Sequence, residues 1–308
     1  MRHDGDCLVK MRIIKADAWK PLYPFASNYM YLPNTGARMH FLDECNAEPG
    51  KEREPIVCVH GNPTWSFYYR ELVKAFRPHH RVVVPDHIGM GLSDKPQEYD
   101  YCLRRHIDNL ELLLEKLNLE PFTLVVHDWG GAIGMGYAVR HPEKVKHILF
   151  LNTAAYRSPF MPGTIRLARV PFLGSLLVRG LNAFVLGAIL TSTKRPISSY
   201  IAAGYKAPYN SWANRVAVLR FVQDIPMGPE HPSYETLKEI ELNLPKLAAI
   251  PKTFVWGALD HVFNDKFLQH WQTIYPEAEY HRLDDVGHYV MEDASERVFE
   301  HLRALLAR

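Results

Sequence analysis

The stretch that decides the fold is T-L-V-V-H-D-W-G-G-A, from Thr123 to Ala132. Its apolar, β-branched first half gives way abruptly to small residues, a pattern typical of a buried strand that turns into a helix. A strand, a sharp turn and a helix with small residues after the corner form an elbow that lifts one side chain out of the end of a sheet. Asp128 stands at this corner, so it is a candidate nucleophile, helix cap or metal ligand.

Short apolar runs alternate with helical patterns on both sides of this elbow. The runs expected to form central parallel strands are residues 56–60, 82–85, 122–127, 147–151 and 253–256. Between them, residues 103–117 repeat apolar side chains on one face of a 3.6-residue helix. Residues 28–32 and 38–42 are expected to add antiparallel strands at one edge. The repeated β–α units predict an α/β fold with a mostly parallel central sheet flanked by helices.

The alternation stops between residues 154 and 228, which are rich in proline, glycine and aromatic residues. Helical patterns in this segment cover residues 165–168, 176–189 and 212–223. We interpret the segment as a helical cap inserted into a core of residues 1–153 and 229–308. Open α/β sheets bind ligands beyond the carboxyl ends of their strands, so a cap there would cover a site. A long surface excursion without a role in the site is the alternative.

Composition narrows the class of protein. The 308 residues carry a formal net charge of +2, and no basic cluster is dense enough to indicate nucleic acid. The longest strongly apolar stretch, residues 181–190, is too short to span a bilayer, and the first twenty residues lack the apolar core of a secretory signal. The cysteines (Cys7, Cys45, Cys58 and Cys102) contain no CxxC pair, which favours a reducing cytoplasm. No His/Cys spacing indicates a metal site, so a cytoplasmic protein without metal or cofactor is expected.

Two later residues are candidate partners of Asp128. Asp260 directly follows the predicted strand T-F-V-W-G, and His288 lies in D-V-G-H-Y. The order nucleophile, acid, histidine, with each residue at the end of a strand, is that of a catalytic triad. The competing carboxylates are Asp265, Asp284 and Asp285. Asp265 is expected to cap a helix that begins at Lys266, and the other two precede the histidine loop.

The stretch H-G-N-P-T-W, residues 60–65, follows the first predicted core strand. A glycine-proline turn there brings backbone N–H groups toward the corner, where the amide of Trp129 completes an oxyanion hole. Asn62 adds a side-chain amide donor and Trp129 an indole N–H, a pair that suits a small leaving anion. A plain turn asparagine and a packing tryptophan are the alternatives. The glycine-rich residues 86–94 lack the spacing of a nucleotide-binding loop and are expected to form a supporting turn.

Five motifs occur in order along the chain: H-G-N-P-T-W, V-P-D-H-I-G-M-G-L-S-D-K-P, V-V-H-D-W-G-G, W-G-A-L-D and V-G-H-Y. With them the sequence resembles the α/β-hydrolase superfamily, and specifically the haloalkane dehalogenases with an aspartate nucleophile. It is most similar to their third subfamily, in which the acid follows the late strand and an Asn–Trp pair holds the halide. The second subfamily has a glutamate after the preceding strand, where this chain has L-N-T-A-A, so the resemblance supports Asp260.

The β-lactone decarboxylases of long-chain olefin biosynthesis resemble the chain at least as closely. The stretches L-N-T-A-A-Y, L-N-A-F, A-P-Y-N-S-W-A-N-R and F-V-Q-D-I-P are similar to their cap and its edges. The two activities share the nucleophile, the histidine and the Asn–Trp pair, so these motifs do not separate them. Apart from Tyr23-Pro24-Phe25, residues 1–25 lie outside the resemblance.

The resemblance implies a covalent aspartyl-ester mechanism without a cofactor. Asp128 attacks carbon, Asn62 and Trp129 hold the departing halide, and His288, oriented by Asp260, activates the water that hydrolyses the ester. The first prediction is therefore hydrolytic dehalogenation of haloalkanes to an alcohol and a halide. The alternative is decarboxylation of a β-lactone to a long-chain olefin, in which the same carboxylate opens the ring.

Other functions need features that the sequence supplies less well. An epoxide hydrolase needs cap tyrosines, for which the candidates are Tyr200, Tyr205 and Tyr209. A fluoroacetate dehalogenase has an arginine where Trp129 stands, and a non-catalytic scaffold usually lacks a triad member. Candidates for an apolar pocket in the cap are Phe160, Phe172, Leu176, Phe184, Phe221 and Val222. The apolar, slightly basic residues 165–190 could instead contact a membrane, a second copy of the chain or a partner enzyme.

Overall fold

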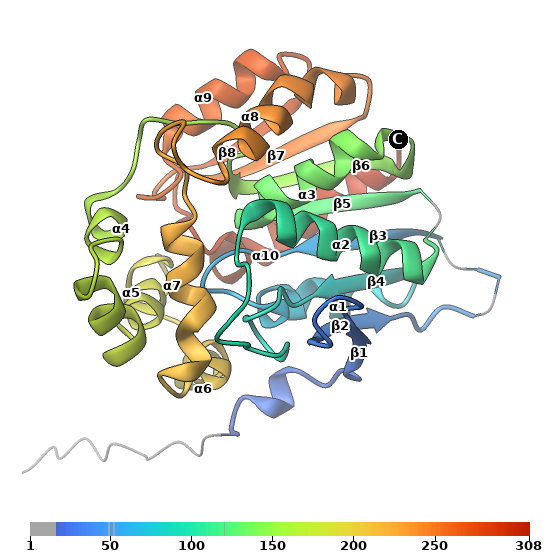
Figure 1. Ribbon diagram of the computed structural model, residues 1–308. Helices are drawn as coiled ribbons and strands as arrows, with labels where there is room; N and C mark the ends of the chain where they lie inside the picture. The colour runs from blue at the N-terminus through green and yellow to red at the C-terminus, as the bar shows by residue number, and fades with distance from the viewer. Residues whose placement is uncertain (1–16, 49, 52, 120) are drawn as a thin grey trace, which may run out of the picture.

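The computed structural model describes residues 17–48, 50, 51, 53–119 and 121–308. Its centre is one eight-stranded sheet with the strand order β1-β2-β4-β3-β5-β6-β7-β8 (Figure 1). The strands are β1 (Asn28–Tyr31), β2 (Arg38–Glu44), β3 (Arg53–Val59), β4 (His80–Pro85), β5 (Phe122–Asp128), β6 (Val145–Thr153), β7 (Lys252–Gly257) and β8 (Glu279–Leu283). The expected absence of a secretory signal and Cys7 fall in residues 1–16, which lie outside the described residues.

The predicted sheet is confirmed. Strands β3 to β8 run parallel to one another, and β1 and β2 form the predicted antiparallel edge, where β2 pairs with β4. The central strands read as continuous apolar runs because helices cover both faces of the sheet, and β5 is buried along its whole length. β8 was not predicted, because its charged and half-exposed side chains follow the pattern of an edge strand rather than of a buried one.

The helices are α1 (Arg70–Phe76), α2 (Leu103–Leu117), α3 (Trp129–Arg140), α4 (Gly163–Ala168), α5 (Ala183–Thr191), α6 (Ser199–Lys206), α7 (Val216–Gln223), α8 (Tyr234–Asn243), α9 (Asp265–Ile274) and α10 (Val290–Leu306). α2, α3 and α8 pack together on one face of the sheet, and α1 and α10 lie on the other (Figure 1). α2 has the predicted bounds, because its apolar stripe faces α3 and its end is set by Asn118, which adopts the left-handed conformation.

Helices α4 to α7 lie together at one side of the molecule, beyond the ends of the strands (Figure 1). The single helix predicted over residues 176–189 is wrong. A π-helical turn, η4 (Ser175–Gly180), and α5 are separated at Asn182, whose φ of 56° breaks the helix. The apolar pattern continues through the break, so periodicity alone did not reveal it.

No helix in the described part of the chain is long and apolar enough to cross a membrane.

Candidate active site

The elbow is built by close backbone packing. Asp128 ends β5 with φ 53° and ψ −128°, a strained conformation for a residue with a Cβ. A Cβ at Gly61 would lie 2.0 Å from the Asp128 carboxylate, and a Cβ at Gly130 would lie 2.0 Å from the carbonyl oxygen of Val59. These glycines let the loop after β3 and the start of α3 close around the carboxylate. The side chain of Asp128 makes no helix-capping hydrogen bond, so the capping interpretation fails.

One oxygen of Asp128 is held and the other is exposed to the site. The backbone N–H of Asn62 donates to Oδ1 at 2.6 Å, and the backbone N–H of Trp129 also donates to this carboxylate. Two backbone amides that converge on one carboxylate resemble the geometry of an oxyanion hole. Burial raises the pKa of the Asp128 carboxyl, while the charge of His288 and the two amides offset part of that rise. The other oxygen, Oδ2, lies on the side of His288.

His288 lies between the two carboxylates. Its Nδ1 is 2.8 Å from Oδ2 of Asp260, and its Nε2 is 3.6 Å from Oδ2 of Asp128. Burial alone would lower the pKa of His288, but the charges of Asp260 and Asp128 outweigh burial and raise it. Burial opposes ionisation of Asp260 as well, yet the neighbouring His288 keeps the pKa of Asp260 below its usual range. The structure thus brings together the three residues that the sequence placed at separate strand ends.

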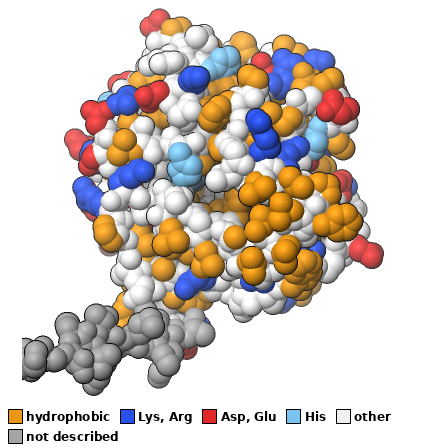
Figure 2. Space-filling view, turned by 90° about the vertical axis from the view of Figure 1, so that its left-hand side faces the viewer, with side chains coloured by type: hydrophobic (Ala, Val, Ile, Leu, Met, Phe, Trp, Pro, Cys, Tyr) orange, Lys and Arg blue, Asp and Glu red, His pale blue; other side chains and the backbone are white. Residues whose placement is uncertain are grey.

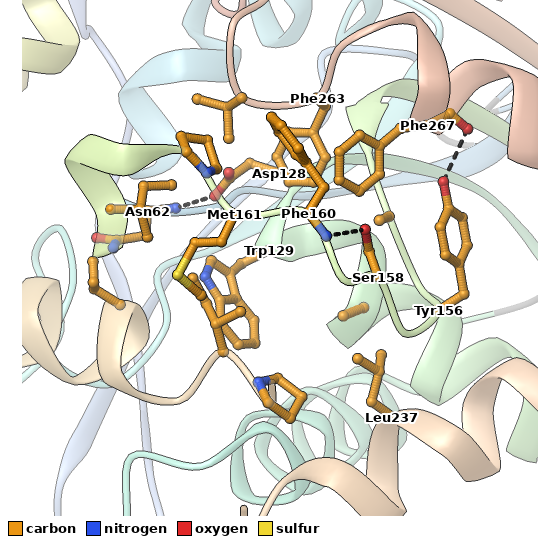
Figure 3. Close-up of a pocket in the computed structure, with 18 of the residues that line it drawn as sticks. Asn62, Asp128, Trp129, Tyr156, Ser158, Phe160, Met161, Leu237, Phe263 and Phe267 are labelled. Atoms are coloured by element: carbon orange, nitrogen blue, oxygen red, sulfur yellow. Dashed lines mark hydrogen bonds between the residues drawn. The ribbon is translucent and has the colours of Figure 1, made fainter. Parts of the chain in front are cut away.

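The two expected side-chain donors also lie at Asp128. Asn62 donates one amide hydrogen to the carbonyl oxygen of Val218 at 3.1 Å, and its second hydrogen has no acceptor among the described residues. The indole N–H of Trp129 likewise has no acceptor in the described part of the chain, and its ring packs edge-on against Phe221 at 5.4 Å. Figure 3 shows the Trp129 indole directly beside Asp128 in the cavity. Each side chain therefore keeps one N–H without an acceptor in the described part of the chain, close to Asp128.

Two apolar cavities meet at Asp128. The first, of about 130 Å³, extends between Trp129, Met161 and Leu237 (Figure 3). The second, of about 750 Å³, runs along α4 and α5 past Gly187 and also touches His288. Residues common to both cavities are Asn62, Asp128, Ile165, Phe184 and Val262. Asp128 therefore stands at a fork, with an apolar branch on each side.

The predicted pocket residues are only partly correct. Phe160, Phe184 and Val222 line the first cavity. Phe172 and Leu176 are exposed, and Phe221 is buried against Trp129 without lining either cavity.

Two positioning residues were missed by the sequence analysis. Asn152, at the end of β6, exchanges hydrogen bonds with the backbone of Gly257 at 2.7 and 2.9 Å and so fixes the turn before Asp260. Asp293 accepts hydrogen bonds from the backbone N–H groups of Gly287, Lys194 and Arg195. Asp293 thereby ties the histidine loop to the segment that follows α5. An asparagine after a strand and an acid in the first turn of a helix carry no distinctive sequence pattern.

The competing carboxylate Asp265 and the glycine-rich turn of residues 86–94 have structural roles. Asn264, rather than Asp265, caps α9 by accepting from the N–H of Lys266, and Asp265 pairs with Arg282. In the glycine-rich turn, the buried Asp86 accepts backbone N–H groups, including that of Leu92. Within residues 17–48, 50, 51, 53–119 and 121–308, no cluster of three or more His, Cys, Asp or Glu side chains could hold a metal ion.

The model of the α/β-hydrolase fold family matches residues 54–295. The strand order, the elbow at Asp128 and the late histidine agree with this match, and the chain belongs to that family. Its relatives by sequence are enzymes.

The chain is 48% identical to a cis-3-alkyl-4-alkyloxetan-2-one decarboxylase of Shewanella oneidensis, over 92% of this chain and 88% of the relative. It is 39% identical to a protein of the same name from Xanthomonas campestris, over 89% and 93% of the two chains. It is 30% identical to a haloalkane dehalogenase of Mycolicibacterium paratuberculosis, over 92% and 95%. The resemblance of the sequence to the haloalkane dehalogenases and to the β-lactone decarboxylases is thus confirmed.

Solved structures share the fold. A crystal structure of a haloalkane dehalogenase from Bradyrhizobium elkani superposes with a TM-score of 0.83, at 24% identity, over 92% of this chain and 98% of the other. A putative ancestral haloalkane dehalogenase superposes with a TM-score of 0.80 at 26% identity, over 91% and 98%.

Proposed function

We propose that the protein is a β-lactone decarboxylase that converts a cis-3-alkyl-4-alkyloxetan-2-one to an olefin and carbon dioxide. In this proposal Asp128 is the nucleophile, His288 its charged partner and Asp260 the acid that orients His288. Asn62 and Trp129 supply the oxyanion hole and bind the leaving anion. Residues 1–153 and 229–308 form the catalytic core, and residues 154–228 form the cap that shapes the substrate cavity.

The observation that carries this proposal is the fork at Asp128. A cis-3,4-dialkyl lactone has one chain on each of two adjacent ring carbons, so its ring fits at a junction and its chains need two apolar branches. The first cavity offers one branch and the second cavity the other, with the carboxylate at the point where they meet. The relatives that are 48% and 39% identical carry the name of this activity, which supports the same assignment.

The chemistry begins with attack on an sp³ carbon. Oδ2 of Asp128 attacks C4 of the ring, and the C4–O1 bond breaks with its electrons moving to O1. The product is an alkyl ester on Asp128 and a free carboxylate on C3. The unpaired N–H groups of Asn62 and Trp129 would bind that carboxylate, as they would bind a halide.

Loss of carbon dioxide completes the reaction without water. The electrons of the C2–C3 bond form the C3=C4 double bond while the Asp128 carboxylate leaves C4, which releases carbon dioxide and restores the enzyme. Attack inverts the configuration at C4, and the carboxylate and Asp128 then leave in an anti elimination. The two steps together equal a syn loss of carbon dioxide from the ring, so a cis lactone gives a cis olefin. Protonated His288 stabilises the carboxylate that is regenerated.

Hydrolytic dehalogenation, the first prediction from the sequence, is a second candidate that the geometry also supports. Asp128, the N–H pair and a histidine within reach of the ester would carry it, and relatives near 30% identity are named haloalkane dehalogenases. An epoxide hydrolase lacks comparable support. The hydroxyl of Tyr209 donates to the carbonyl oxygen of Thr64 and that of Tyr205 to Glu292, and neither residue lines either of the two cavities at Asp128.

The test is a side-by-side assay of the purified protein on a cis-3,4-dialkyl β-lactone and on 1-bromoalkanes. We expect olefin and carbon dioxide from the lactone at a rate far above halide release. Faster release of halide and alcohol would favour the second candidate. Hydrolysis of the lactone to a hydroxy acid, without olefin, would contradict decarboxylation.

We also propose a cytoplasmic location. Cys45, Cys58 and Cys102 form no disulfide among the described residues, which suits a reducing compartment.

A further inference from the structure

Hydrophobic side chains gather on one exposed face of α4, η4 and α5, which we call the cap face. Its members are Leu167, Val170, Phe172, Leu173, Leu176, Leu181, Leu186 and Leu190. Figure 2, which views this side of the molecule, shows hydrophobic side chains gathered over one broad area of the surface. Phe172 is 91% exposed and Leu190 80% exposed. Contiguous apolar patches of this kind mark interaction sites on soluble proteins.

The charge of the cap is one-sided. Residues 144–223 contain no Asp or Glu, and residues 154–228 contain nine Lys and Arg with Asp224 as the single acid. Because the whole chain has a formal charge of +2, the cap carries +8 and the rest of the chain −6. Among the described residues, Arg166, Lys194 and Lys206 form no ion pair, although Arg195 lies 3.7 Å from Asp285. An apolar face on a segment with unneutralised positive charge is complementary to an anionic, partly apolar surface.

The cap face also adjoins the entrance to the site. Leu167, Leu190 and Lys194 line the second cavity together with Asp128 and His288. The same side chains therefore belong to the outer surface and to the wall of a cavity that reaches the nucleophile. A long apolar molecule could pass from a covering apolar phase to Asp128 without crossing water.

We propose that the cap face docks on a lipid bilayer with anionic headgroups, so that the second cavity opens toward the membrane. Phe172 and Leu190 enter the boundary of the hydrocarbon region, while basic side chains of the cap meet the headgroups. A symmetric dimer through this face would place two caps of charge +8 against each other, which disfavours a second copy as the occupant. The docking does not depend on the proposed function.

The test is co-sedimentation of the full-length protein with vesicles of phosphatidylcholine alone or mixed with phosphatidylglycerol. We expect binding to the mixed vesicles to be at least roughly tenfold stronger, and to weaken as salt is raised. Leu190→Ser should weaken binding to the mixed vesicles by roughly tenfold, because it removes an exposed apolar side chain that docking buries in the bilayer. Leu242→Ser on α8 is the matched control, since Leu242 is 66% exposed but lies outside the cap face, and should leave binding unchanged.

Three outcomes would overturn the proposal. They are no binding to either vesicle, equal binding to both, and equal loss for Leu190→Ser and Leu242→Ser. A dimer in solution that Leu190→Ser dissociates, without vesicle binding, would assign the face to a second copy instead. Capture of a protein partner through this face without vesicle binding would also exclude the membrane. Vesicle binding is measured without turnover, so its failure is distinguishable from failure of the decarboxylation assay.

Discussion

Asp128 and Phe172 are both non-glycine residues with a positive φ. The φ of Asp128, at the elbow, is 53°, and that of Phe172, between α4 and η4 in a turn that we call the cap tip, is 61°. Asp128 is buried under backbone amides, glycines and a histidine. Phe172 is almost fully exposed and touches solvent on most of its surface. A positive φ thus occurs once at a buried residue and once at a residue that is almost fully exposed.

The difference shows what maintains each conformation. At the elbow, the strain points a carboxylate at its partners, and the surrounding contacts over-determine the geometry. At the cap tip, the positive φ accompanies an aromatic ring that is almost entirely exposed and has little contact with the rest of the described chain. The elbow is therefore expected to matter for chemistry, and the cap tip for what lies outside the protein.

The largest effect is expected from Asp128→Asn. The amide is isosteric but is a poor nucleophile, so turnover of the lactone and of bromoalkanes should fall on the order of 10⁴-fold or more. The measurement is olefin and halide release, with the thermal midpoint as the control for folding. An active Asp128→Asn protein with unchanged folding would remove the elbow from the chemistry.

His288→Phe is expected to separate the two reactions. Dehalogenation needs a neutral His288 as base, and because its pKa is raised, that activity should be lost as pH falls through a value above about 6.5. In the variant, halide should be released once per enzyme, and mass spectrometry should find an alkyl ester on Asp128. Decarboxylation uses no water and should continue.

His288→Phe should also shift the acid limb of the pH–rate profile of decarboxylation. Losing the positive charge of His288 raises the pKa of Asp128 further, so the ionised nucleophile disappears at a higher pH than in the wild type. The pH profile of olefin formation checks this shift. An unchanged acid limb together with lost activity would argue that His288 takes part in proton transfer instead.

Matched substitutions in the two branches should change chain-length preference with a smaller effect. Gly187 lines the second cavity, and a Cβ there would meet nothing within 4 Å, so the larger side chain of Gly187→Leu is expected to narrow that branch. Ala132→Leu narrows the first branch. The two test substrates are isomeric lactones that carry one long chain, on C3 in one isomer and on C4 in the other. Each variant should lose roughly tenfold or more in kcat/KM for one of these isomers only, and the two variants should differ in which isomer they lose. Identical losses for both isomeric lactones would contradict the fork.

Much of the sheet could be predicted because burial on both faces leaves continuous apolar runs, and α2 because its stripe ends at Asn118. β8 escaped because an edge strand has no such run. The break at Asn182 was not predicted, because the residues on both sides of it are apolar. Only the backbone conformation shows where one helix ends and the next begins. Local patterns therefore located the elements that face the core and failed at edges and in the cap.

The candidate site followed from the same rule, because Asp128 ends a parallel strand and Asn62 and Asp260 come shortly after two others. Asn152 and Asp293 act through backbone groups of distant segments, and such contacts leave no pattern in the chain. The fork depends on which way the side chains of α4 and α5 point, which is fixed by packing after the helix break. Sequence could suggest an apolar pocket but not its division into two branches.

The smallest effect, and the sharpest for the comparison, is expected at Phe172. Phe172→Gly should raise the free energy of unfolding relative to Phe172→Ala by about 1 kcal/mol, because only alanine keeps the Cβ that is strained at φ 61°. The corresponding rise in the thermal midpoint is about 2 °C or less for a chain of this length. Both variants remove the exposed ring and should weaken vesicle binding equally. If alanine proves as stable as glycine, the turn at Phe172 is not strained in solution, and the parallel with Asp128 fails at its cap end.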